Sequence, residues 1–425
     1  MESVTPQMTV IRPGRLIDGR GGEPEEGKAV ALRGSRILWV GPQEQLGSRE
    51  GPPGPVDAAS GGQVLDFPQA TMLPGLIDCH THTNMPGDGR TGEEVNRETD
   101  DVRLLRSAKN VRRALVSGVT TLCDCGSWNR TGFSLRQGID QGVVDGPRVL
   151  VAGPPITITG GHLWYMGGEA DGVEGVRHRV RQLIKDGATI IKVIASGGST
   201  TTSDPFRPSL GVDELRTVTA EAHNRGRPVA AHCRSTVSIN NALDAGVDLI
   251  FHCFFHDSDG SYRFDQATAE RLAGAPVWVN PTLYLGRPRL ALLKGKLKEG
   301  GLSEEEQAML DWLEQGERRR MEQFGKLIEM GVKLVGGSDA GWSMYPFGDF
   351  QGELLALTDA GLSPMQAILA GTREGAAALG FLGSIGTIEA EKEADLLLVD
   401  GNPAEDITAL RRVAAVFHGG RRADG

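Results

Sequence analysis

Short apolar runs alternate with longer amphipathic stretches from about residue 72 to residue 379. Continuous apolar runs of this length are typical of strands that are buried on both faces of a parallel sheet. Eight such runs occur, at residues 76–78, 120–123, 149–152, 190–194, 228–231, 249–251, 277–279 and 333–335. Because strands and helices alternate about eight times, the pattern predicts an α/β fold, a TIM (β/α)8 barrel. An open doubly wound sheet is the alternative.

The helical stretches carry recognisable start signals. Ser303 with Glu306 and Ser363 with Gln366 both resemble capping boxes, which satisfy free backbone N–H groups at a helix start. A long charged helical segment, residues 287–329, separates the last two predicted strands. It could be a lid or a subunit contact, and the sequence leaves that choice open.

The two ends of the chain read as short strands and turns. Each end is too small to bury a sizeable core alone, so we expect them to pack together as one small β-sandwich domain. The predicted division is residues 1–70 for the first part of this domain, 71–380 for the barrel and 381–425 for the second part.

Composition narrows the class of partner. A net charge of −10 argues against a general nucleic-acid or anionic-membrane partner, because both require basic surfaces. The first four residues lack a signal-peptide layout, no apolar run is long enough for a membrane span, and the five cysteines form no disulfide framework. We therefore expect a cytoplasmic homo-oligomer that acts on a small molecule.

Polar residues able to bind metal close or follow several of the predicted strands. They are His80, His82, Lys192, His232, His252 and Asp339. In a barrel, residues at the carboxyl ends of the strands point into one mouth. His80 and His82 are two residues apart, so in an extended segment both side chains lie on one face and can reach one ion. The pattern predicts two divalent ions, expected to be zinc, with cobalt or manganese as alternatives.

Lys192 lies inside an apolar strand, where an unpaired ammonium is costly. Burial lowers the pKa of an amine and makes it nucleophilic enough to add carbon dioxide. The resulting carbamate is an anion with two oxygens, which suits it to bridging two cations. The chain lacks the Gly-x-Ser-x-Gly and His-Glu-x-x-His motifs of serine hydrolases and zincins.

The residues around these positions resemble a known family. Leu73 to His82 is similar to the opening strand of the amidohydrolase superfamily, Gly386 to Pro403 to its closing β-domain, and Ile17-Asp18-Gly19 to its first hairpin. The resemblance is strongest to the imidazolonepropionase-related group, which includes Xaa-Pro and Xaa-Arg dipeptidases and hydrolases of amide, urea and carbamate compounds. It implies that Lys192 is carboxylated and that His162 touches the substrate.

One position departs from the pattern of that group. The dipeptidases have His-Ala-Tyr after the fifth strand, where this chain has His232-Cys233-Arg234. Arg234 could clamp a substrate carboxylate or stabilise the oxyanion. We expect Trp164, Tyr165 and Tyr284 to contribute to the pocket wall.

Together these residues predict a hydrolase that cleaves an amide or peptide-like C–N bond with a metal-bridging hydroxide. Asp339 would shuttle the proton, and His162 and Arg234 would orient the substrate. The alternatives are a mononuclear deaminase or cyclic amide hydrolase on the same barrel, and a hydrolase of urea, carbamate or ester compounds.

Overall fold

The computed structural model describes residues 8–52 and 62–423, which fall into two compact units. The first unit comprises Met1–Ile77, Arg113–Thr121 and Leu362–Gly425, and the second comprises Asp78–Arg112 and Leu122–Gly361. The first four residues, which carry the prediction about a signal peptide, lie outside the described residues. Within the described part of the chain, no helix is both long and apolar enough to cross a membrane.

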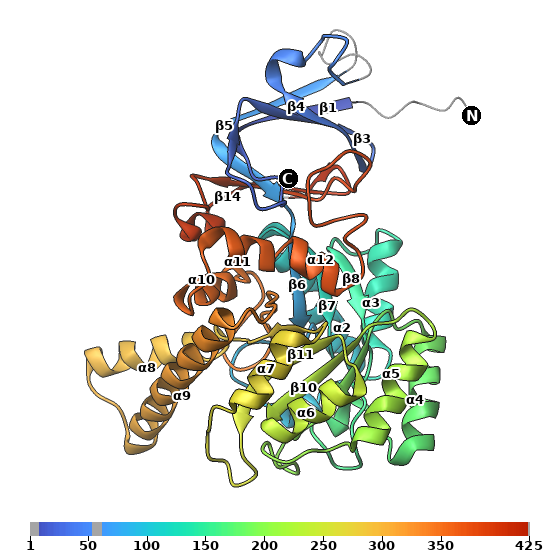
Figure 1. Ribbon diagram of the computed structural model, residues 1–425, viewed down its shortest axis with the longest axis vertical. Helices are drawn as coiled ribbons and strands as arrows, with labels where there is room; N and C mark the ends of the chain where they lie inside the picture. The colour runs from blue at the N-terminus through green and yellow to red at the C-terminus, as the bar shows by residue number, and fades with distance from the viewer. Residues whose placement is uncertain (1–7, 53–61, 424–425) are drawn as a thin grey trace. The chain divides into compact units, whose positions relative to one another are not determined.

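The first unit is built on one eight-stranded sheet to which both ends of the chain contribute (Figure 1). The strand order is β15-β14-β13-β5-β1-β3-β4, with β2 paired to β1. Strands β1 and β5 are parallel, and β13 joins β5 in antiparallel register. Apolar residues of β1, β5 and β13 meet in one core, including Ile11, Met72 and Leu398. The strands are β1 (Met8–Leu16), β2 (Glu25–Glu26), β3 (Lys28–Arg33), β4 (Arg36–Pro42), β5 (Gln63–Pro74), β13 (Leu396–Asp400), β14 (Val413–His418) and β15 (Arg421–Arg422).

Seven of the eight predicted apolar runs form strands of two further sheets. One sheet has the order β12-β11-β10-β9, with all neighbours parallel, and the other has the order β6-β7-β8. Nearly every residue of these strands is buried, which explains why the sequence shows continuous apolar runs instead of alternation. The strands are β6 (Leu76–Thr81), β7 (Val119–Asp124), β8 (Arg148–Val151), β9 (Ile191–Ile194), β10 (Val229–Ser235), β11 (Leu249–His256) and β12 (Trp278–Asn280).

The eighth predicted run does not form a regular strand. Leu334 makes an isolated parallel bridge to Val279, and Ala340 makes another to Thr81. The two bridges lie on either side of Gly336 and Gly337, where the chain has little local preference for extended backbone. A third bridge, between Ile156 and Val193, links the segment after β8 to β9. The α/β class predicted from the sequence is confirmed.

Helices lie between most of these strands. Ser303 and Ser363 are the N-caps of α9 and α11, and both capping boxes are formed as predicted. The segment 287–329 is a helical hairpin of α8 and α9 (Figure 1). Leucines of α8 pack on leucines of α9. The helices are α1 (Gly92–Val95), α2 (Asp100–Val116), α3 (Thr131–Asp140), α4 (Gly172–Asp186), α5 (Val212–His223), α6 (Thr236–Ala245), α7 (Gln266–Gly274), α8 (Arg287–Glu299), α9 (Glu304–Glu329), α10 (Gln351–Asp359), α11 (Pro364–Ala370) and α12 (Arg373–Ala378).

Candidate metal centre and substrate pocket

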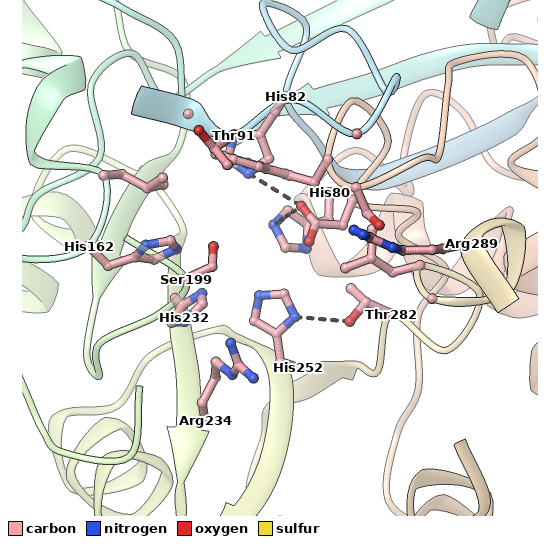
Figure 2. A pocket seen from close by; sticks show the side chains of 18 of the residues that line it. His80, His82, Thr91, His162, Ser199, His232, Arg234, His252, Thr282 and Arg289 are labelled. Carbon is pink, nitrogen blue, oxygen red and sulfur yellow. Dashed lines mark hydrogen bonds and ion pairs between the residues drawn. The ribbon is translucent and has the colours of Figure 1, made fainter. Parts of the chain in front are cut away.

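A cavity of about 390 Å³ in the second unit is lined by every residue predicted to bind metal. The carboxyl-terminal half of β6 supplies His80, and His82 follows that strand directly. Lys192, His232 and His252 come from β9, β10 and β11. Asp339 comes from the loop after the Leu334 bridge. His162 and Arg234 line the same cavity (Figure 2).

The nitrogen and oxygen atoms of this group lie close together. Asp339 Oδ1 is 3.4 Å from His80 Nε2 and 3.4 Å from His82 Nε2. One ligand atom each from His80, His252 and Asp339 lies within 4.8 Å of the other two. The rings of His232 and His252 are 4.5 Å apart at their centroids. The folded chain therefore gathers residues that are up to 259 positions apart in the sequence.

Three of these histidines are oriented by a hydrogen bond at Nδ1. His80 Nδ1 lies 3.0 Å from Asn280 Oδ1, His82 Nδ1 lies 3.1 Å from the Gly126 carbonyl, and His252 Nδ1 lies 2.9 Å from Thr282 Oγ1. Metal-binding histidines usually have such a partner on the nitrogen that does not face the ion. With Nδ1 engaged, Nε2 is the nitrogen left for a ligand.

The other two histidines are also held by hydrogen bonds. His162 Nδ1 lies 2.8 Å from Thr200 Oγ1, which also accepts a hydrogen bond from the Leu163 backbone N–H. His232 differs because its Nε2 lies 3.1 Å from the Gly197 carbonyl, which leaves Nδ1 for a ligand.

Asp78 connects β6 to the loop that carries Asp339. Its carboxylate accepts hydrogen bonds from the Ser338 backbone N–H at 2.9 Å and from the Ser338 hydroxyl at 2.5 Å. The Asp339 N–H then donates to the His80 carbonyl at 2.7 Å. Asp339 has a φ of 57°, in the left-handed region that side chains other than glycine rarely adopt. Backbone strain of this kind concentrates at functional sites and persists where surrounding contacts hold it.

Burial sets the charge state of the site. It lowers the pKa of His82 to about 3, and it lowers the pKa of His80, His232 and His252 well below the ordinary value. These histidines are therefore neutral at pH 7, which is the state that binds metal. Burial also raises the pKa of Asp339 to about 8, so without a nearby cation this carboxyl would hold a proton at neutral pH.

Lys192 is buried in the middle of the group. Its side chain is 1% exposed, and its Nζ lies 3.4 Å from His80 Nε2 and 4.0 Å from the centre of the Phe251 ring. No carboxylate among the described residues forms an ion pair with it. Burial lowers the pKa of this amine. An ammonium in such surroundings is poorly stabilised, which favours the neutral amine.

The donor set fits divalent cations. The neutral imidazoles and one carboxylate are ligands that zinc, cobalt and manganese accept. Asp339 Oδ1 is buried and has no hydrogen-bond partner among the described residues, so it is left free to bind an ion. The Gly126 Cα approaches the His82 ring so closely that a Cβ there would lie 2.8 Å from Cε1. Only a glycine at position 126 leaves enough room for the His82 ring in this position.

The predicted aromatic wall is not where the sequence placed it. Among the described residues, those that line the cavity do not include Trp164, Tyr165 or Tyr284. Tyr165 instead stacks on Trp128 at 5.5 Å, and Tyr284 packs edge-on against Tyr345 at 5.0 Å. Contacts with residues distant in the sequence therefore position both tyrosine rings.

Several residues important to this site were missed by sequence analysis. The apolar wall comes from residues of β11, the α8–α9 hairpin and three loops, namely Leu163, Phe254, Leu285, Met309, Trp312, Leu313 and Trp342. Arg320 also lines the cavity. Asn280 and Thr282 could have been found, because they directly follow the seventh apolar run, where polar residues point toward a site.

Known proteins resemble this chain along nearly its whole length. The model of the amidohydrolase family matches residues 71–423. Ochratoxinase of Aspergillus niger is 26% identical over 453 residues, covering 97% of this chain and 85% of the relative. Imidazolonepropionase of Bradyrhizobium is 24% identical over 424 residues, covering 92% of this chain and 93% of the relative.

A solved structure is similar over the same extent. A Xaa-Pro dipeptidase with methionine bound in its active site has a TM-score of 0.82 at 26% identity, and the match covers 99% of this chain and 100% of that one. The resemblance inferred from the sequence is thereby confirmed, as is the enzyme class, a hydrolase that acts on carbon–nitrogen bonds. The chain belongs to the amidohydrolase family.

Proposed function

We propose that this protein is a binuclear metal-dependent hydrolase that cleaves an amide bond of a small peptide-like substrate. The observation that carries the proposal is the position of Lys192. It is buried without an acidic partner among the described residues, and its amine lies 3.4 Å from His80 Nε2 in a cavity that His82, His232 and His252 also line. Similarity to a Xaa-Pro dipeptidase and to ochratoxinase supports a substrate with an amide bond.

The residues divide into two ligand groups around Lys192. His80, His82 and Asp339 would hold one ion, and His232 and His252 would hold the other. The neutral Lys192 amine would add to carbon dioxide, losing one proton and forming a carbamate whose two oxygens reach both ions. Two bound divalent ions would supply Lewis acidity at the scissile carbonyl and lower the pKa of water.

The remaining roles belong to the protein's own side chains. The Asp339 carboxylate would accept a proton from the attacking water and pass it to the leaving nitrogen. His162 is held at Nδ1 by Thr200, so its Nε2 would be available to orient the carbonyl oxygen of the substrate. We also propose that the second unit is a (β/α)8 barrel and that both chain ends form a small β-sandwich. The bridges Leu334–Val279, Ala340–Thr81 and Ile156–Val193 support closure of the barrel.

A single-metal deaminase is the rival on this scaffold. It would require a glutamate after the fifth strand, where this chain has Cys233 and Arg234. The number of ions bound per chain separates the two proposals, since the rival needs one ion and the hydrolase needs two.

The proposal is tested with the full chain loaded with zinc, cobalt or manganese in bicarbonate buffer. The substrates are Xaa-Pro and Xaa-Arg dipeptides, N-acyl amino acids and anilides. We expect hydrolysis of at least one class, loss of that activity in Lys192→Ala, and partial rescue of the variant by propionate, whose carboxylate can replace the carbamate. Lys185→Ala, which changes an exposed lysine on α4, is the matched control. Full activity in Lys192→Ala would refute the two-metal proposal.

A further inference from the structure

Two arginines line the cavity without an acidic partner. Arg234 lies near the carboxyl end of β10, and Arg320 lies on α9. The Nε atom of each is buried and has no hydrogen-bond partner. In the described parts of the chain, neither guanidinium forms an ion pair with a carboxylate. Figure 2 shows Arg234 beside His232 and His252, with its guanidinium near the two histidine rings.

Other arginines of this unit have acidic partners, unlike Arg234 and Arg320. Arg287, on the same hairpin as Arg320, bonds Glu317 at 2.8 Å and Asp359 at 2.6 Å. Arg103 is 4% exposed and bonds Asp100 together with two backbone carbonyls. Arginines with little solvent exposure are normally paired in this way, because an unpaired buried charge is destabilising. Two arginines that lack an ion pair inside a pocket therefore indicate a ligand whose negative charge pairs with them.

Both guanidiniums remain charged at neutral pH. Burial lowers the pKa of Arg234 to about 10, and it also lowers the pKa of Arg320. Neighbouring positive charge adds to the effect, since Arg320 is the second cause of the shift at Arg234. Both guanidiniums lie beside the Phe254 ring, so an anion bound to both would offset their positive charge.

Phe254 and Gly316 mark where such an anion would bind. The guanidinium carbon of Arg234 lies 5.7 Å from the centre of the Phe254 ring, and that of Arg320 lies 5.8 Å from it. The absence of a side chain at Gly316 makes room for Arg320, because a Cβ there would lie 3.1 Å from Arg320 Nη1.

We propose that Arg234 and Arg320 together bind a carboxylate of the substrate, beside Phe254 and next to the metal centre. Guanidinium groups bind carboxylates through charge-assisted hydrogen bonds, often two at a time. The apolar part of the substrate would lie against Met309, Trp312 and Leu313, which line the same cavity. This inference rests on the proposed function and narrows it to amides that carry a carboxylate, such as N-acyl amino acids with an apolar side chain.

The first test compares two acetamides that differ only in the carboxylate, N-acetyl-L-phenylalanine and N-acetyl-2-phenylethylamine. In the metal-loaded enzyme we expect kcat/KM to be at least tenfold higher for the acid. Arg320→Met and Arg234→Met should each lower the ratio of kcat/KM for the acid to kcat/KM for the neutral amide at least tenfold. Arg319→Met, an exposed neighbour on α9, is the control and should change neither. Equal kcat/KM for both amides in the wild type would overturn the inference and leave the proposed function intact.

A binding measurement separates failure of the inference from failure of the proposed function. Calorimetry with 4-phenylbutanoate and 4-phenylbutan-1-ol needs no turnover, because neither compound has an amide bond. We expect the acid to bind more tightly than the alcohol, and Arg320→Met to weaken binding of the acid alone. The same dissociation constant for the acid in wild type and Arg320→Met would overturn the inference, whether or not any amide is hydrolysed. The melting temperature of Arg320→Met should equal or exceed that of the wild type, since the change removes an unpaired charge.

Discussion

His80 Nδ1 and Asn280 Oδ1 lie 3.0 Å apart, and this contact fixes how His80 presents its other nitrogen. The Asn280 amide nitrogen donates to the Gly337 carbonyl at 2.8 Å, so Oδ1 is the atom that faces His80. His80 Nδ1 must therefore be the donor, and Nε2 carries the free lone pair. Asn280 is thus a positioning residue for a proposed metal ligand.

Asn280→Leu should weaken metal binding. Removing the acceptor frees the ring of His80 and lets it adopt the other tautomer, and loss of such a partner weakens metal affinity by about 10- to 100-fold. Competition with a fluorescent chelator measures the affinity. Asn280→Asp keeps an acceptor toward His80 and is the matched comparison, expected to bind metal more tightly than Asn280→Leu. Equal affinity in wild type and Asn280→Leu would exclude the positioning role.

Gly198→Ala should reduce activity without removing metal. A Cβ at this position would lie 2.4 Å from His162 Cδ2, so the ring has to move. Because a displacement of about 1 Å in a positioning group lowers turnover on the order of 100-fold, kcat/KM should fall by about that factor. Metal content, measured by mass spectrometry, should stay the same. Gly295→Ala on α8 is the control, since a Cβ there meets nothing within 4 Å. Unchanged kcat/KM in Gly198→Ala would show that His162 does not orient the substrate.

Glu353 should make stability depend on pH. Its carboxylate accepts the backbone N–H groups of Leu283 and Tyr284 at 3.0 and 2.8 Å, and burial raises its pKa from 4.5 to about 7. The folded state therefore holds a proton that the unfolded state releases between pH 4.5 and pH 7. The stabilisation is complete below pH 4.5 and is lost as the pH rises through 7.

Glu353→Gln removes this titration. Between pH 5 and pH 7 the free energy of unfolding of the wild type should fall relative to that of the variant by roughly 2 kcal/mol. Urea denaturation at both pH values measures the difference. If the gap between the two proteins is the same at pH 5 and pH 7, Glu353 does not carry the raised pKa.

The sequence located the candidate ligands because the relevant signal is local. A short apolar run that is soon followed by a histidine marks both a buried strand and a polar residue that reaches the site, as at β6 with His80 and β11 with His252. The structure of the eighth run was harder to predict. Only Leu334 of that run pairs with another strand, through a single bridge. Its length and apolar character resemble those of the other seven.

The substrate side of the pocket could not be predicted in the same way. Tyr165 follows His162 closely in sequence, yet its ring stacks on Trp128, a partner that only the folded chain brings near. Arg320 is one of three consecutive arginines on a helix, and nothing in the sequence marks it as the one that reaches the cavity. Such contacts depend on how loops and the α8–α9 hairpin pack against distant strands.

The number of divalent ions bound per chain tests the central claim most directly. It is measured by elemental mass spectrometry on the full chain, purified and dialysed in bicarbonate buffer with zinc. We expect two ions per chain in the wild type and fewer than two in Lys192→Ala, because the carbamate would join the two ligand groups. One ion in the wild type, or two in both proteins, would contradict it.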